Sequence, residues 1–387
     1  MTRDDKRGKG AHTVVRVACA IAFLVFSVAY IHFYQADILA VTQHALSHGQ
    51  TSYSPMVGTP IIIVVAWAVQ LWMYAMIRLE GSFHGFTYFP SLLLLGVLTS
   101  ADSSITEGFS LNKWTWLLPL LLVVWAGVAA ALRHLQDFGV DSGGKERFFR
   151  SLWLSLLTLV LMMIMTGTVG NGDDIFHYRA RAEIRLLEGD TQRALLAGRK
   201  AMTTDRNLTM TRCYALALEG RLGESLFTYP LTGRAEDMVP MEGGSKTLIY
   251  PVDSIYHFLG AKPRGPMTTS RYLELLFLKG KASKAVADYR LCGRLVDRDL
   301  DGFVALLPQY YAINDSLPRH YKEALILYNH LRAAPAISYT NEVMDTDYRD
   351  MRNMEAQCKT IGERRLNMFD HYFGTYWWYY EYKLEKR

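Results

Sequence analysis

The sequence predicts an all-α protein, in which an N-terminal bundle of about five transmembrane helices precedes a water-exposed array of helical pairs. Three observations support this. Residues 1–172 contain five uncharged apolar runs, residues 173–387 show helical spacing with glycine turns, and charge is unevenly divided. The first segment holds 11 Lys/Arg and 9 Asp/Glu, whereas the second holds 31 and 28. The boundary at residue 172 therefore separates a membrane domain from a helical domain.

The five apolar runs lie near residues 17–34, 59–77, 85–101, 114–132 and 151–172. A helix needs about 20 mostly apolar residues to cross a bilayer, and these runs are close to that length. The third run is the shortest, so a tilted span, a re-entrant segment and an interfacial segment all stay open for it. The first run has the composition of a retained anchor or of a signal peptide, and its long apolar core favours the anchor.

The distribution of Lys and Arg predicts the orientation of these helices. With a cytoplasmic N-terminus, the cytoplasmic segments carry ten Lys/Arg, and the outer loops 35–58 and 102–113 carry only Lys113. Cytoplasmic loops of membrane proteins are enriched in such residues. An odd number of spans then places residues 173–387 on the extracytoplasmic side.

Helical pairs are expected after the last apolar run, because small residues and glycine turns recur at regular spacing. The residues predicted to pack the pairs are Tyr178, Ala182, Gly189, Ala194, Ala201, Gly220, Gly280, Ala285, Tyr289, Ala324 and Tyr328. This pattern resembles the tetratricopeptide (TPR) repeat, with Arg206 where that family prefers proline. The resemblance implies a TPR-like solenoid, and helical hairpins without true repeat geometry are the alternative.

Two further segments interrupt or close this array. Residues 231–269 are rich in Pro and Gly, which excludes a long helix and predicts either an ordered loop packed on the array or a partner-binding loop. Residues 369–382 form an aromatic segment that we expect to be one helix capping the array, with membrane-interface anchoring and ligand binding as alternatives. The aromatic residues assigned to this cap or binding surface are Tyr372, Phe373, Tyr376, Trp377, Trp378 and Tyr380.

The sequence has no recognisable nucleophile elbow, phosphate-binding loop, dinucleotide fingerprint or zinc helix. We therefore assign no catalytic, cofactor-binding or metal-binding residue. The four cysteines lack metal-binding spacing and are expected to be buried thiols, although a Cys213–Cys292 disulfide stays open. His32 is expected to lie at the membrane interface or to pack between helices, and the pair Asp173–Asp174 is expected to cap a helix.

The layout resembles uncharacterised Bacteroidetes-type multispan membrane proteins with a TPR-like tail. This implies a protein of the bacterial inner membrane, with lipid around its spans and its C-terminal domain in the periplasm. The expected function is a scaffold or adaptor that binds a protein or peptide, and no basic stripe indicates nucleic acid. The alternative is an enzyme or transporter for lipid-linked glycan or envelope components, whose only outer-loop acids are Asp37, Asp102 and Glu107.

Overall fold

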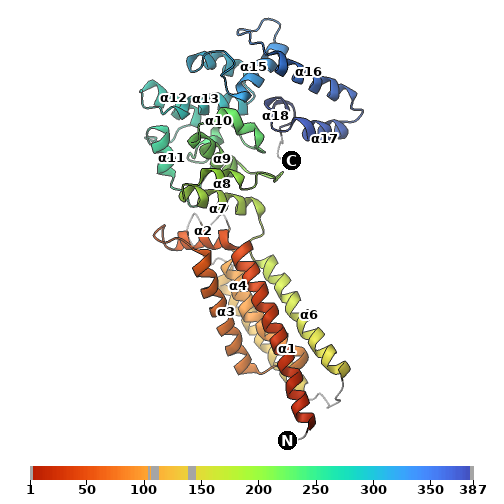
Figure 1. The fold of residues 1–387 in the computed structure, drawn as a ribbon. Coiled ribbons are helices and arrows are strands. Elements are labelled where there is room, and N and C mark those ends of the chain that lie inside the picture. Colours follow the sequence, from red (N-terminus) through yellow and green to blue (C-terminus); the bar gives the residue numbers. More distant parts are fainter. Residues whose placement is uncertain (1–2, 103–104, 106–112, 138–144, 384–387) are drawn as a thin grey trace. The chain divides into compact units, whose positions relative to one another are not determined.

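The computed structural model describes residues 3–102, 105, 113–137 and 145–383, and within these ranges every regular element is a helix. The chain divides into two compact units, Met1–His177 and Tyr178–Arg387 (Figure 1). The expectation of an all-α protein is confirmed.

The first unit contains five helical segments that are long and apolar enough to cross a membrane. They are His12–Tyr34, Pro55–Ile77, Gly81–Leu98, Trp114–Leu135 and Phe148–Val169. The elements of this unit are α1 (Arg3–Val28), the π-helix η1 (Ala29–Tyr34), α2 (Ala36–Leu46), α3 (Pro55–Ile77), the 3₁₀-helix η2 (Gly81–Tyr88), α4 (Phe89–Leu98), α5 (Trp114–Asp137) and α6 (Lys145–Val169).

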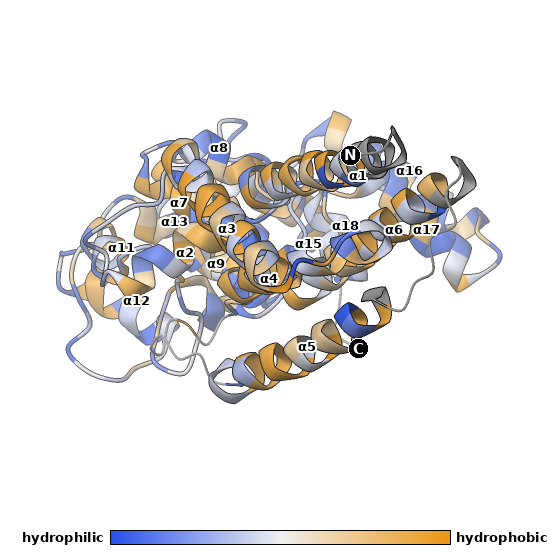
Figure 2. Ribbon diagram, turned by 90° about the horizontal axis from the view of Figure 1, so that it is seen from below, coloured by the Kyte–Doolittle hydropathy of each residue, from blue (hydrophilic) through white to orange (hydrophobic). Residues whose placement is uncertain are grey.

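Apolar side chains cover these helices on more than the face that packs inside the unit. Val64 of α3 is 66% exposed and Val123 of α5 is 70% exposed. Figure 2 shows hydrophobic residues along most of the length of α3 and α5. A helix that is apolar all round belongs in a large core or in a lipid bilayer. The five predicted apolar helices are therefore confirmed as membrane-length segments.

The third apolar segment is not one uniform α-helix, because η2 precedes α4. Its close packing against α6 depends on Gly85, where an added Cβ would lie 2.2 Å from the backbone oxygen of Ser155. The Gly85 N–H donates to the hydroxyl of Ser155 at 2.7 Å. Pro90 stands at the start of α4, where the missing N–H has no helical partner to lose.

Several buried polar side chains of the first unit are paired with one another or with backbone. Tyr30 and Thr99 hydroxyls lie 2.7 Å apart, and the Gln35 side chain donates to the carbonyl of Asn171 at 2.9 Å. An unpaired polar group costs several kcal/mol in a bilayer core, so such pairing is required there. His32 lies 3.5 Å from the Thr59 hydroxyl, within the same unit.

The second unit consists of short helices joined by tight turns. Its elements are α7 (Asp174–Leu187, which begins just before the boundary), α8 (Thr191–Leu196), α9 (Arg206–Leu218), α10 (Leu222–Ser225), η4 (Leu226–Thr228), η5 (Ala235–Met238), α11 (Val252–Leu259), α12 (Thr269–Leu278), α13 (Ala285–Val296), α14 (Leu300–Leu306), η6 (Leu307–Gln309), α15 (Arg319–Leu331), α16 (Glu342–Gln357), α17 (Ile361–Tyr372) and α18 (Tyr376–Tyr382).

Glycine residues with left-handed backbone end three of these helices. Gly189, Gly220 and Gly280 have φ of +76°, +65° and +64° and follow α7, α9 and α12. Glycine adopts this conformation without the steric penalty of a Cβ. Polar residues then cap the N-termini of the next helices, as Asp190 does by accepting the Arg193 N–H at 2.9 Å. This chemistry explains why so many short helices follow one another.

One core joins these helices, and it includes contacts between segments far apart in the chain. α10 packs against α15 as well as α9, and α18 packs against α15. The aromatic segment is not the single helix that the sequence predicted. Gly374, with φ of +96°, separates α17 from α18, so the aromatic residues before and after it do not share one continuous helical face.

Candidate functional site

The residues predicted to pack the helical pairs lie mainly in the interior of the second unit. Ala182, Ala194, Ala324, Tyr289 and Tyr328 are buried, while Tyr178, Ala201 and Ala285 are partly buried. Tyr178 packs against Gly198, where an added Cβ would lie 2.6 Å from the tyrosine ring. These residues form the interior of the second unit, so a binding surface has to be formed by other side chains.

The aromatic residues near the C-terminus are also mostly interior. Tyr376, Trp377 and Trp378 are buried, and Tyr372, Phe373 and Tyr380 are partly buried. Trp377 donates its indole N–H to the backbone carbonyl of Glu323 at 2.7 Å. Because the buried aromatic rings fill the core of their own unit, they do not form an exposed shelf for a ligand.

A buried carboxylate anchors the Pro/Gly-rich segment 231–269. Glu183 is fully buried and accepts hydrogen bonds from three consecutive backbone N–H groups, those of Leu248, Ile249 and Tyr250, at 2.7–2.9 Å. Burial raises the pKa of the Glu183 carboxyl, while the amide donors and the positive charge of Arg179 oppose that rise. Glu183 is therefore one of the side chains that fix the segment on the helices, together with Arg179, which donates to the Lys246 carbonyl at 3.1 Å.

A buried guanidinium fastens a second point of the same unit. Arg212 is 1% exposed and donates to the carbonyls of Gly198 at 2.9 Å and Pro230 at 3.1 Å. Its guanidinium also lies over the Tyr229 ring, 5.4 Å from the centroid. Burial lowers the pKa of Arg212 to about 10, so the side chain stays charged at neutral pH. Arg212 thus connects α9 with the turn after α8 and with Pro230, the residue that precedes the 231–269 segment.

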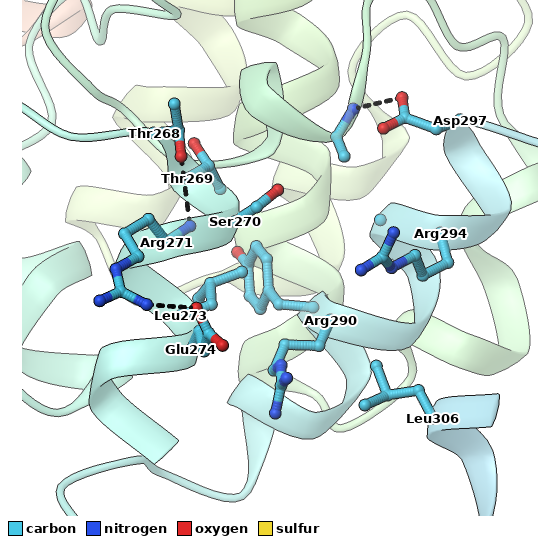
Figure 3. Close-up of a pocket in the computed structure, with 13 residues that line it drawn as sticks. Thr268, Thr269, Ser270, Arg271, Leu273, Glu274, Arg290, Arg294, Asp297 and Leu306 are labelled. Carbon is cyan, nitrogen blue, oxygen red and sulfur yellow. Dashed lines mark hydrogen bonds and ion pairs between the residues drawn. The ribbon is translucent and has the colours of Figure 1, made fainter. Parts of the chain in front are cut away.

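The strongest candidate for a binding site is a pocket between α12 and α13, shown in Figure 3. Its volume is about 340 Å³, near the lower end of the range for small-ligand sites. α12 contributes Arg271 and Glu274, and α13 contributes Arg290 and Arg294. The remaining lining residues are Ala235, Thr268, Thr269, Ser270, Leu273, Tyr289, Gly293, Asp297 and Leu306.

Most charged groups of this pocket already have partners. Arg271 pairs with Glu274 at 2.7 Å, and Arg294 pairs with Asp299 at 2.8 Å. Asp297 accepts the backbone N–H of Ala235 at 3.0 Å. These pairs fix the rim of the pocket and leave Arg290 as the exception.

Arg290 is partly buried and lies over the rings of Phe277 and Tyr310, 5.1 Å and 5.7 Å from their centroids. It donates to the Tyr310 hydroxyl, and no acid in the part of the chain that the structure describes forms an ion pair with it. The neighbouring Tyr289 hydroxyl is buried without a hydrogen-bond partner among the described residues. The pocket therefore contains a positive charge that no described acid neutralises.

An arginine-lined pocket of this kind is suited to anions. A guanidinium presents a planar set of N–H donors that matches the two oxygens of a carboxylate. The sequence carries a signal for this site that lies outside the repeat pattern. Arg290 and Arg294 are four residues apart and so lie on one face of α13. Arg271 could not be assigned to this site from the sequence, because only the fold places α12 beside α13.

Acidic and thiol groups singled out in the sequence do not assemble elsewhere. Asp173 accepts the Ile175 N–H at 2.9 Å, in agreement with its expected capping role. Asp37 lies in the first turn of α2, and Glu107 lies outside the described residues. Cys213 and Cys292 are free, buried thiols. Within the described ranges, no group of three or more His, Cys, Asp or Glu could hold a metal ion.

The fold and the pocket define an all-helical protein with five membrane-length helices in one unit and a small polar pocket in the other. Residues 266–383 match a family of unknown function (DUF6057). The match covers the pocket residues of α12 and α13 and the aromatic segment, but it excludes the membrane-length helices. No curated protein and no solved structure matches the chain.

Proposed function

We propose that this protein is a membrane-anchored scaffold or adaptor whose C-terminal helical unit binds a protein or peptide partner. The observation that supports the proposal is that one chain contains both membrane-length helices and a separate unit with a polar pocket. Five membrane-length apolar helices lie in one compact unit, and a separate compact unit carries the polar pocket. Such a chain has the parts needed to hold a binding site at a membrane.

The proposed location is a bacterial inner membrane, with the N-terminus in the cytoplasm and residues 178–387 in the periplasm. The ten-to-one bias of Lys and Arg between the two sets of loops supports this orientation. The resemblance to Bacteroidetes-type multispan proteins with a TPR-like tail points the same way. The lipid bilayer is then the first partner of the protein.

We assign the helical pairs of the second unit to a TPR-like arrangement. The glycine turns Gly189, Gly220 and Gly280 and the buried Ala182, Ala194 and Ala324 support that reading. Stacked helical pairs of this kind present extended surfaces that hold peptides and partner proteins. A protein partner follows from this arrangement more directly than a chemical reaction does.

Photo-cross-linking in living cells tests the proposal. A photoreactive residue replaces Leu278, which is 66% exposed in the second unit, in the full-length chain. We expect a discrete protein adduct at Leu278. The matched position is Val123, which is 70% exposed on a membrane-length helix and should label lipid instead. The absence of a protein adduct at Leu278, and also at the exposed Val343 and Ile361, would contradict the proposal.

A further inference from the structure

Arg290 carries a positive charge that the described chain does not neutralise. Each nearby acid is already engaged, since Glu274 pairs with Arg271, Asp299 pairs with Arg294, and Asp297 holds the Ala235 amide. A charged group that is partly withdrawn from water is stabilised by a counter-charge with matching hydrogen bonds. The pocket beside Arg290 is the space where such a counter-charge fits.

We propose that this pocket binds one carboxylate group of the partner peptide, held by the guanidinium of Arg290 and by the N–H groups that Arg294 does not use for Asp299. The carboxylate belongs either to the peptide C-terminus or to an Asp or Glu side chain. The inference rests on the proposed function for the identity of the partner, but the anion site itself stands on the pocket alone.

The charge of the lining favours a carboxylate over a phosphate group. Three arginines and two acids, Glu274 and Asp297, line the pocket, and Asp299, which pairs with Arg294, brings the formal charge of these six groups to zero. A carboxylate carries one negative charge, whereas a phosphate group carries about 1.5 to 2 at neutral pH. A phosphate dianion would therefore face Glu274 and Asp297 with excess negative charge.

The protein already binds one of its own carboxylates at the same end of α12. Glu236 accepts the Thr269 N–H at 2.5 Å and the Ser270 hydroxyl at 2.7 Å. The backbone N–H groups of Thr269 and Ser270, which both donate to Glu236, are free N–H groups of the helix N-terminus and are favourable partners for an anion. The helix terminus is thus occupied, and an incoming carboxylate is left with the guanidiniums.

The geometry supplies more than charge. Arg290 and Arg294 project from the same face of α13, and Arg290 is held in place by the Phe277 and Tyr310 rings. Thr268 accepts the Arg271 N–H through its hydroxyl oxygen at 3.3 Å, so its O–H can still donate to a ligand. A fixed guanidinium loses less freedom on binding than a flexible lysine would.

Fluorescence anisotropy with the full-length protein in detergent tests this inference. Three labelled Ala/Gly peptides serve as probes: one with a free C-terminus, one amidated with a single internal Glu, and one amidated with Gln in its place. We expect saturable binding of at least one carboxylate peptide and at least about tenfold weaker binding of the Gln peptide. The stronger of the first two peptides identifies the source of the carboxylate.

Variants then connect the binding to the pocket. Arg290→Gln should raise the Kd of the carboxylate peptide by at least about tenfold, and Arg290→Lys should cause a smaller loss because the charge is kept. Arg349→Gln is the matched control, since Arg349 is 66% exposed on α16 of the same unit. If circular dichroism shows that Arg290→Gln does not fold, the Kd of Arg294→Gln, at the exposed rim, tests the inference instead.

Three results would overturn the inference. They are the absence of saturable binding, equal affinity of the wild type and the arginine variants, and stronger competition by inorganic phosphate than by acetate at equal ionic strength.

Failure of the proposed function is a separate outcome. In that case the carboxylate peptides bind the pocket, but Leu278 yields no protein adduct in cells. If the adduct forms equally in wild type and Arg290→Gln and no peptide binds, the scaffold role stands and the carboxylate site falls.

Discussion

The side chain of Glu323 accepts a hydrogen bond from the backbone N–H of Tyr376, with Oε2 2.6 Å from the nitrogen. The same carboxylate pairs with His320 at 2.8 Å and with Arg319 at 2.7 Å. Glu323 lies on α15 and Tyr376 begins α18, so one buried carboxylate fastens the C-terminal aromatic helix to the core. His320 in turn receives the Phe227 N–H through Nε2 at 3.3 Å, which requires the proton on Nδ1 if the ring is neutral.

Replacing this carboxylate should loosen the C-terminal helix. We expect Glu323→Gln to lower the free energy of unfolding by about 3 kcal/mol, because it leaves His320 and Arg319 without their buried anion. The measurement is protease resistance of the full-length protein during a urea titration. Glu188→Gln is the control, since Glu188 pairs with Arg185 on the surface and should change stability by less than about 1 kcal/mol. Equal effects of the two substitutions would refute the anchoring role.

The same carboxylate predicts a pH dependence. Burial alone would raise the pKa of Glu323, yet the hydrogen bond from His320, the positive charge of Arg319 and the Tyr376 amide together hold the pKa below its ordinary value. The stabilisation is therefore present above the unfolded pKa of about 4.3 and is lost as pH falls through the lower folded pKa. The stability difference between wild type and Glu323→Gln should shrink in that acidic range. A difference that stays constant from neutral to strongly acidic pH would contradict this assignment.

The sequence predicts a structural feature well when that feature depends on residues that are close together in the chain. The apolar runs and the turn glycines are local, because helix length and left-handed backbone follow from neighbouring residues alone. Gly374 carried the same signal, but the aromatic spacing on both sides of it suggested one uninterrupted helix. The structure shows that the conformational preference of a single glycine overrides that spacing.

The buried polar side chains that hold distant segments together, and the pocket, could not be predicted from the sequence in the same way. Glu183 and Tyr250 are 67 residues apart, and Arg290 gains meaning only beside α12. Their partners are backbone amides, aromatic rings and a neighbouring helix, which leave no pattern in residue spacing. The residue spacing did show that Arg290 and Arg294 lie on one face of a helix.

Gly374→Ala should destabilise the junction between α17 and α18. A residue with a Cβ pays about 1–2 kcal/mol for left-handed backbone, and φ at Gly374 is +96°. Gly362→Ala in the first turn of α17 is the matched control, because nothing lies within 4 Å of its added Cβ and its φ is not positive. That control should be neutral or slightly stabilising. Thermal unfolding of both variants checks the prediction, and a Gly374→Ala protein as stable as Gly362→Ala would refute it.

Glu183→Gln should free part of the 231–269 segment. The amides of Leu248, Ile249 and Tyr250 would lose their anionic acceptor, and hydrogen bonds to a charged group are the stronger kind. Hydrogen exchange of these three amides should therefore speed up. Glu242→Gln, an exposed change in the same segment, should leave their exchange unaltered. Unchanged protection in Glu183→Gln would show that other contacts hold the segment.

The proposed orientation predicts which side of the membrane each unit's surface faces. Because Cys19, Cys213, Cys292 and Cys358 are buried, an introduced surface cysteine can be labelled selectively. In intact bacterial cells, a membrane-impermeant maleimide should label Ser338→Cys, which is exposed in the second unit. It should label Arg78→Cys, an exposed position just after α3, only after the inner membrane is broken, because positively charged loops are retained in the cytoplasm. Labelling of Arg78→Cys in intact cells, with Ser338→Cys protected, would reverse the orientation and place the arginine-lined pocket among cytoplasmic partners.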